Sequence, residues 1–407
     1  MNVLVVAPQT SSYRGPELTA ARTVKWALRM GHKALLVASA FHDWEPVVSE
    51  RELARSLSGY IPFERDPEAG VPSARAISFK SAIPARRITM RDFFSVLRAL
   101  DEELGVDLVV VHSTFWNGPE EAARWAKWKR ELASIGERVR PTVFAYMPHY
   151  RPVEPGLGPV ERTLRLAWSA TALPQVLRSA DLILCESPLE CDELTSMGAD
   201  RNKTVQYRGF LDDDFASLVD SARPDLIRDR LRVREDHIVG YVGPLEPRKN
   251  VLAVLQTAKR LEGRGVAFVV AGDGDEAERL RREASRLSNV YFAGLLSEEE
   301  KASLIKASLA NIILSRAEGL GVTQIEFMYG GVPVITSASY GQRWLVRDGV
   351  DGIHVRGPDD VEGAARAVEA LERDVALRES LGRNARERAR GFLMSEGLVQ
   401  LLNQAGR

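Results

Sequence analysis

Short segments of almost wholly apolar, often β-branched residues recur along the chain, and a helical pattern follows most of them. Such segments are typical of parallel strands whose two faces are both covered. Strands that alternate with helices predict βαβ units and doubly wound parallel sheets. Because the chain has 407 residues, which is too long for one ordinary core, two α/β domains are expected. The predicted strands are residues 2–7, 34–38, 107–111, 141–147, 180–187, 238–242, 266–271, 290–294 and 310–314.

The strongest functional pattern lies in residues 315–333, directly after the last of these strands. Glu318-Gly319-Leu320-Gly321 forms a turn whose glycines let a ligand approach the backbone closely. A helix is predicted to begin at Val322-Thr323, and its free N–H groups and partial positive charge suit a phosphate. Glu326 lies roughly 6 Å further along the helix axis, near the separation of a diphosphate from its ribose.

Glu318 is expected on the other side of the phosphate, where a transferred group would lie. A plain strand–loop–helix unit, with a solvated Glu318 and Glu326 bonded to backbone, is the competing interpretation of the motif by itself.

Glu318, Glu326, the two glycines and the following Gly-Val-Pro-Val-Ile together resemble the signature of the retaining glycosyltransferases of family 4, the group of glycogen synthases and phosphatidylinositol mannosyltransferases. The resemblance implies the GT-B fold, in which two Rossmann-like doubly wound domains face a central cleft. It places residues 1–215 in an acceptor-binding domain, 216–236 in a linker and 237–392 in a domain that binds the nucleotide-sugar donor. A last helix at about 393–407 is expected to cross back onto the first domain.

The resemblance also implies a donor site. Its diphosphate would lie on Gly319, Leu320, Gly321, Val322 and Thr323, with Glu326 on the ribose and Glu318 at the sugar. The family pattern Gly-Arg-Leu followed by Lys is matched at Lys249, whereas Pro244 stands where the family has Arg, and Arg248 is the candidate second cation. Gly272 belongs to a turn that resembles the family's Gly-Asp-Gly turn in the donor site, and the nucleobase would lie near Phe292.

The acceptor site is expected in the first half of the chain, where polar groups follow strands. Arg14 and Gly15 lie in the first loop, although Pro16 stands where the family usually has a second glycine. His112, Trp116 and His149 follow two later strands, and His149 resembles the family's histidine near the reacting sugar. Trp116 has a second interpretation as a core residue.

Composition limits the other classes of function. The net charge is −1, from 55 basic and 56 acidic residues, so no global field for nucleic acid or membrane is indicated. Six scattered histidines indicate no metal site, and the two cysteines favour a reduced, cytoplasmic protein. Residues 41–91 form either an irregular insertion with solvated charges or a basic patch for an anionic acceptor or the inner membrane face, through Arg75, Lys80, Arg86, Arg87 and Arg91.

The resulting hypothesis is a retaining, metal-independent hexosyl- or glycosyltransferase without a cofactor. Its substrates would be a UDP-, GDP- or ADP-sugar donor and a sugar, glycan, small-molecule or lipid-linked acceptor, and Glu318, His149 and Lys249 would be catalytic. Two alternatives stay open: a GT-B enzyme that makes a disaccharide or a sugar phosphate, and a catalytically silent nucleotide-sugar-binding protein.

Overall fold

The computed structural model describes residues 1–10, 15–42, 45–49, 52, 59–80, 88–137, 139–150 and 158–406. They divide into two compact units. Unit 1 holds the described residues up to Tyr207 together with those from Gly397 onward, and unit 2 holds Arg208–Glu396.

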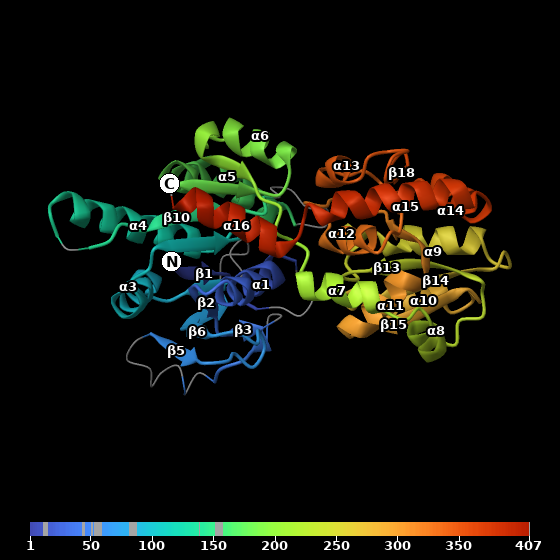
Figure 1. Ribbon diagram of the computed structural model, residues 1–407, viewed down its shortest axis with the longest axis horizontal. Helices are drawn as coiled ribbons and strands as arrows, with labels where there is room; N and C mark the ends of the chain where they lie inside the picture. Colours follow the sequence, from blue (N-terminus) through green and yellow to red (C-terminus); the bar gives the residue numbers. More distant parts are fainter. Residues whose placement is uncertain are drawn as a thin grey trace. The chain divides into compact units, whose positions relative to one another are not determined.

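Unit 1 is built on a sheet with the strand order β12-β11-β10-β9-β1-β2-β6-β5 among the described residues (Figure 1). Neighbouring strands are parallel except β5, which is antiparallel to β6. The strands of this sheet are β1 (Asn2–Val6), β2 (Lys33–Ser39), β5 (Tyr60–Phe63), β6 (Ser73–Ala76), β9 (Leu108–His112), β10 (Val143–Met147), β11 (Leu182–Cys185) and β12 (Thr204–Gln206). The helices are α1 (Gly15–Arg29), α3 (Phe93–Leu104), α4 (Gly118–Ser134), α5 (Pro159–Ser179) and α6 (Pro188–Ser196), with a 3-10 turn η1 (Arg201–Lys203).

The core of unit 1 follows directly from its apolar strands. All five residues of β9 are buried, as are the last four of β1, because helices cover the central sheet. Trp125 and Trp116 lie in the same buried cluster. Two short hairpins lie outside the sheet: β3 (Phe41–His42) with β4 (Glu45–Pro46), and β7 (Ser78–Lys80) with β8 (Ile88–Met90).

Unit 2 has a wholly parallel sheet of order β15-β14-β13-β16-β17-β18, drawn from yellow to red in Figure 1. Its strands are β13 (His237–Val242), β14 (Val266–Ala271), β15 (Val290–Gly294), β16 (Ser308–Ile313), β17 (Val334–Thr336) and β18 (Gly352–His354). The helices are α7 (Asp213–Ser221), α8 (Asp225–Leu231), α9 (Val251–Arg260), α10 (Ala277–Ala284), α11 (Glu298–Ala307), α12 (Val322–Tyr329), α13 (Gly341–Leu345), α14 (Val361–Arg373) and α15 (Val375–Arg390), with a 3-10 turn η2 (Pro247–Lys249). Helix α16 (Met394–Ala405) begins in unit 2 and continues into unit 1.

The division of the chain differs from the expected one. Residues 216–236 were predicted as a linker, but they contribute to α7 and α8, which both pack against α11 in unit 2. Val219 on α7 and Ile227 on α8 are fully buried, although charged residues surround them in the sequence. Helix α15 continues through Gly382 without a break. A Cβ at this position would lie 2.2 Å from the carbonyl oxygen of Gly331, so glycine permits the close approach of the two backbones.

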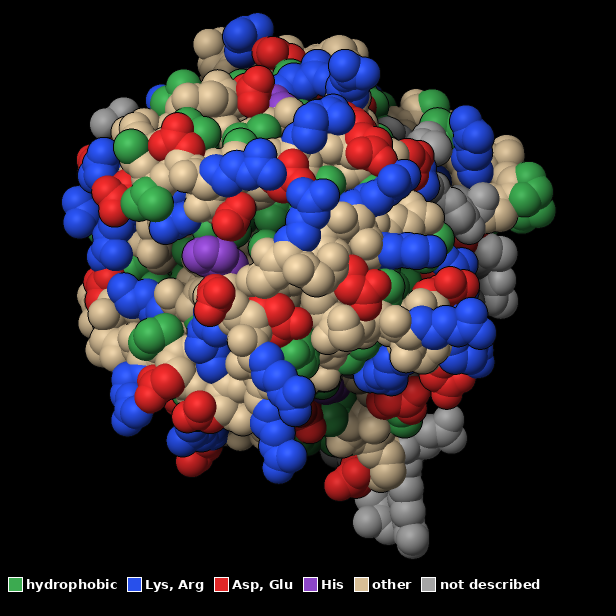
Figure 2. All heavy atoms as spheres, turned by 90° about the vertical axis from the view of Figure 1, so that its right-hand side faces the viewer, with side chains coloured by type: hydrophobic (Ala, Val, Ile, Leu, Met, Phe, Trp, Pro, Cys, Tyr) green, Lys and Arg blue, Asp and Glu red, His purple; other side chains and the backbone are tan. Residues whose placement is uncertain are grey.

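The described residues of the range 41–91 include a buried charge cluster. Arg75 was counted in the predicted basic patch, but its guanidinium is 1% exposed and bonds to Asp66, Thr10 and the carbonyls of Ser39 and Phe41. Figure 2 draws a different face, the right-hand side of Figure 1, and basic and acidic side chains are interspersed on it. Lys80 and Arg91 are exposed, whereas Arg86 and Arg87 lie outside the described residues.

The two cysteines are joined in a disulfide, which corrects the expectation of a reduced protein. Cys185 ends β11 and Cys191 lies on α6, and the intervening turn brings their Cα atoms to 5.5 Å, a usual separation for this bond. No helix of the described chain has the length and apolarity to cross a bilayer.

Candidate functional site

A cluster of opposite charges lies where the carboxyl ends of β13 and β16 meet in unit 2. The ammonium of Lys249, at the end of η2, donates to Glu318 Oε2, and Arg248 Nη1 lies 3.7 Å from Glu318 Oε1. The Glu318 carboxylate is 6% exposed and also receives a contact from Ser315 Oγ at 3.4 Å. The structure therefore brings together the acid and both cations that the sequence predicted, on neighbouring strand ends.

The glycine turn that follows Glu318 positions the start of α12. Gly321 precedes the helix with a φ of 93°, a left-handed conformation that glycine adopts without strain. The first N–H groups of the helix, from Val322 and Thr323, have no carbonyl one turn earlier within the helix. They make the start of α12 electropositive next to the Lys249–Glu318 pair.

Glu326 is occupied by a partner that the sequence did not indicate. Its carboxylate is 4% exposed and accepts a hydrogen bond of 2.9 Å from Lys301 Nζ, on α11. The same ammonium lies 4.0 Å from the ring centroid of Phe215. The structure holds Glu326 in a paired, buried position in the second turn of α12.

Arg316 ties the two loops of this cluster together. Its backbone N–H donates to the carbonyl of Arg248 at 2.9 Å, and its guanidinium bonds to Asn250 and Asp359. The loop that carries Lys249 is thus fixed against the loop that carries Glu318. Sequence reasoning missed both Arg316 and Lys301, because neither belongs to a local motif.

Close backbone contacts explain why glycine occupies two positions in this part of unit 2. A Cβ at Gly272 would lie 1.9 Å from the carbonyl oxygen of Gly243, so the loops after β13 and β14 touch through bare backbone. A Cβ at Gly341 would lie 1.5 Å from the carbonyl oxygen of Gly319. Phe292 is half-buried on β15, and the guanidinium of Arg281 lies 5.9 Å from its ring centroid.

Unit 1 has a second cluster of titratable groups, at the carboxyl ends of the adjacent strands β9, β10 and β11. His149 Nδ1 lies 2.6 Å from Glu186 Oε1, and His149 Nε2 lies 3.1 Å from His112 Nδ1. His149 has a φ of 49°, which is unusual for a residue with a side chain. Burial, followed by the charge of His149, lowers the pKa of His112 well below its ordinary value.

Glu190 fixes the backbone around this cluster. Its carboxylate accepts from the backbone N–H groups of Tyr150 and Glu186, each at 2.6 Å. The disulfide joins the residue before Glu186 to the residue after Glu190. Neither acid was predicted, since they belong to no motif that the sequence displays.

Three of the predicted acceptor residues are placed differently from the expectation. His112 is 1% exposed and Trp116 is 2% exposed, so both are core residues and neither is open to an acceptor. The indole N–H of Trp116 is directed to the backbone carbonyls of His112 and Ser113. Gly15 begins α1, and Arg14 lies outside the described residues.

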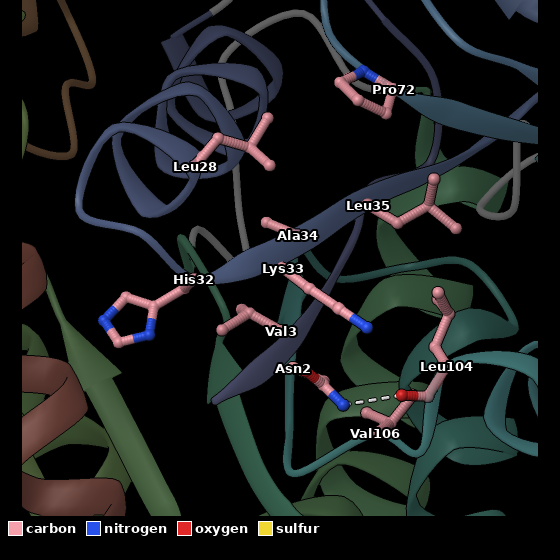
Figure 3. A pocket seen from close by; sticks show the side chains of 10 residues that line it. All are labelled: Asn2, Val3, Leu28, His32, Lys33, Ala34, Leu35, Pro72, Leu104 and Val106. Carbon is pink, nitrogen blue, oxygen red and sulfur yellow. Dashed lines mark hydrogen bonds between the residues drawn. The ribbon is translucent and has the colours of Figure 1, made fainter.

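A hollow of about 310 Å³ lies in unit 1 at the amino ends of the strands, opposite the ends that carry the histidine cluster (Figure 3). Asn2 and Lys33 line it at the amino ends of β1 and β2, and Asn2 Nδ2 donates to the carbonyl of Leu104. Ligands of open α/β sheets bind at the carboxyl ends of strands, so this hollow is not a candidate active site. The described residues contain no group of three or more His, Cys, Asp or Glu side chains placed to hold a metal ion.

The fold is that of known GT-B glycosyltransferases. The structure of HepE from Anabaena in complex with UDP aligns over 100% of both chains with a TM-score of 0.70 at 17% sequence identity. This likeness confirms the predicted fold class.

The sequence adds a more particular match. Residues 223–388 match the family described as Glycosyl transferases group 1. The lipopolysaccharide core biosynthesis glycosyltransferase LpsE of Rhizobium meliloti is 28% identical over 66% of this chain and 76% of its own length. A D-inositol 3-phosphate glycosyltransferase of Kribbella flavida is 30% identical over 54% of each chain, so the chain spans about half the length of that relative. These matches support a glycosyltransferase.

Proposed function

We propose that the protein is a retaining, metal-independent glycosyltransferase of family 4 that transfers a sugar from a nucleotide-diphosphate sugar to a hydroxyl acceptor. The observation that supports it best is the cluster of Glu318, Lys249 and Arg248 beside the start of α12. Two cations and a helix N-terminus favour the two negative charges of a leaving nucleoside diphosphate. UDP is the first candidate nucleotide, because it is the one bound by the structural relative HepE.

In the proposed reaction, the bond between the anomeric carbon and the diphosphate oxygen breaks as the acceptor oxygen attacks from the same face of the sugar. Lys249 and Arg248 stabilise the negative charge that grows on the diphosphate. Lys249 has three N–H donors, so it can hold Glu318 with one and a phosphate oxygen with another. The proton of the acceptor hydroxyl passes to the departing phosphate oxygen, so a separate base is not required.

Glu318 and Glu326 have different proposed roles. Glu318 orients the sugar while positive character develops at its anomeric carbon. Glu326 accepts hydrogen bonds from the ribose hydroxyls, and to do so it must share its carboxylate with Lys301. The relatives are named for different acceptors, so the acceptor class of this chain is not carried over from any one of them.

A panel of UDP-, GDP- and ADP-sugars tests the proposal, first by thermal shift and then by transfer to an acceptor mixture in the presence of a chelator. We expect one nucleotide to raise the melting temperature, and a product whose anomeric configuration matches that of the donor. An inverted product would contradict the retaining mechanism. Binding without transfer or donor hydrolysis, with every acceptor, would instead favour the silent nucleotide-sugar-binding protein.

A further inference from the structure

His149 is held through both of its ring nitrogens. Nδ1 faces Glu186 Oε1 at 2.6 Å, and Nε2 faces His112 Nδ1 at 3.1 Å. The side chains of His149 and Glu186 are 3% and 8% exposed, and His112 is 1% exposed. Proton exchange with a substrate would need a free nitrogen on the imidazole. Both nitrogens of His149 are engaged by described residues.

The positions of the protons in this chain of hydrogen bonds follow from its last atom, His112 Nε2. Among the described residues, His112 Nε2 is buried and has no hydrogen-bond partner. If His149 carried both ring protons, its Nε2–H would donate to His112 Nδ1, and the proton of neutral His112 would be stranded at Nε2. Buried N–H groups without a partner are rarer than buried acceptors with an unused lone pair. The arrangement in which His112 donates from Nδ1 and keeps a bare Nε2 is therefore favoured.

That assignment fixes the tautomer of His149. Its Nε2 accepts from His112, so its own proton is on Nδ1, where the carboxylate of Glu186 accepts it. Among the described residues, Glu186 after β11 and His112 at the end of β9 contact the two ring nitrogens. Glu190 on α6 accepts from the backbone N–H groups of Tyr150 and Glu186, and it thereby holds the backbone of Glu186 in place.

We propose that Glu186 and His112 are positioning residues that lock the His149 imidazole in the Nδ1–H tautomer, so that the ring anchors the strained backbone at residue 149 and does not exchange protons with the substrate. The strained φ of 49° needs such an anchor, because a residue with a side chain leaves this region unless its surroundings hold it. The proposal deepens the function proposed above and rests on it, since the family resemblance implies that His149 acts near the reacting sugar.

The tautomer is measured directly by long-range ¹H–¹⁵N NMR on protein labelled at its histidines, at neutral pH and without substrate. His149→Gln identifies the resonance. We expect a protonated Nδ1 and an unprotonated Nε2 in the wild-type protein, the same tautomer in Glu186→Gln, and a substantial Nε2–H population in Glu186→Ala. The amide oxygen of glutamine accepts the Nδ1–H bond, whereas alanine leaves that proton without its partner.

Kinetics on the same variants separate positioning from general destabilisation. Glu186→Ala should lower kcat by about tenfold or more through misplacement of the His149 backbone, with the KM for the donor changed by less than about twofold. Glu186→Gln should recover most of the rate. Asp192→Asn, which changes an exposed acid on α6, is the control and should behave as wild type.

Each result has a defined meaning. A wild-type His149 protonated at Nε2, or a His149 spectrum that Glu186→Ala leaves unchanged, would overturn the proposal. The NMR measurement needs no enzymatic activity, so it decides this question even if no donor is turned over and the proposed function fails. Glu186→Gln keeps the test valid if Glu186→Ala does not fold.

Discussion

Replacement of Lys249 by methionine is the sharpest test of the donor site, because it removes one charge and keeps most of the side-chain volume. In the structure Lys249 donates to Glu318, and its side chain is 12% exposed. Without it, Glu318 retains Ser315 Oγ at 3.4 Å and Arg248 Nη1 at 3.7 Å. The carboxylate would then face an incoming diphosphate with one cation fewer between them.

The expected loss follows from the kind of contact removed. A hydrogen bond from a charged donor contributes about 1.5–3 kcal/mol, which corresponds to about 10- to 100-fold in affinity. Repulsion between the less screened Glu318 and the diphosphate places the expected value toward the upper end of that range. We therefore expect Lys249→Met to weaken UDP binding by about 100-fold, measured by isothermal titration calorimetry.

Two further variants control this measurement. Lys259→Met removes the same charge from an exposed position in the last turn of α9, about 12 Å from the start of that helix, and should bind UDP normally. Lys249→Arg keeps the charge and should recover most of the affinity. If Lys249→Met melts like the wild type and binds UDP within about twofold of it, the assignment of the donor site is refuted.

Three other predictions concern stability and loop position. Burial alone would raise the pKa of Asp66, but the hydrogen bonds and charge of Arg75 outweigh it and lower the pKa to about 2. Ionised Asp66 therefore contributes about 2 kcal/mol to the free energy of unfolding above about pH 4, and this contribution is lost as the pH falls toward 2. Urea unfolding of Asp66→Asn should show a lower stability at neutral pH and a flatter dependence between these pH values; an unchanged acid transition would contradict this. Gly272→Ala should lower the free energy of unfolding by more than about 3 kcal/mol in the same assay, because its Cβ would overlap the Gly243 carbonyl. A decrease below about 1 kcal/mol would show that the two loops can separate. Arg316→Ala should weaken UDP binding by only about threefold to tenfold, because its ion pair is largely exposed; normal binding would show that this contact does not position the loops.

Elements with a strong local pattern were predictable to within a few residues. The strands at 266–271 and 290–294 lie where the sequence placed them, because their apolar residues pack in the core of unit 2. The charged residues of α7 and α8 favour a linker, because nothing local in the sequence shows that both helices pack against α11. Nothing local in the sequence shows that the backbone of Gly331 passes beside Gly382.

The candidate site was predictable where a motif encoded it and not where tertiary packing did. Glu318 and Lys249 each follow the end of a strand, and the motifs around them predict both as site residues. Their direct contact joins residues 69 positions apart. The pairing of Lys301 with Glu326 depends on which face of α11 packs beside α12, and sequence periodicity does not specify that neighbour. His112 was correctly placed at a strand end, yet its burial depends on side chains that only the folded unit brings over it.

The disulfide of Cys185 and Cys191 gives the loop after β11 a chemical dependence that hydrogen bonds do not have. A bond closed over a sequence separation of six encloses Glu186 and Glu190 in one small covalent ring. Reduction of this bond would open that ring and give Glu186 and the start of α6, which carries Glu190, more conformational freedom. Preparations made with and without reductant are therefore two distinct samples, and rates or spectra obtained from one of them should not be compared with those from the other.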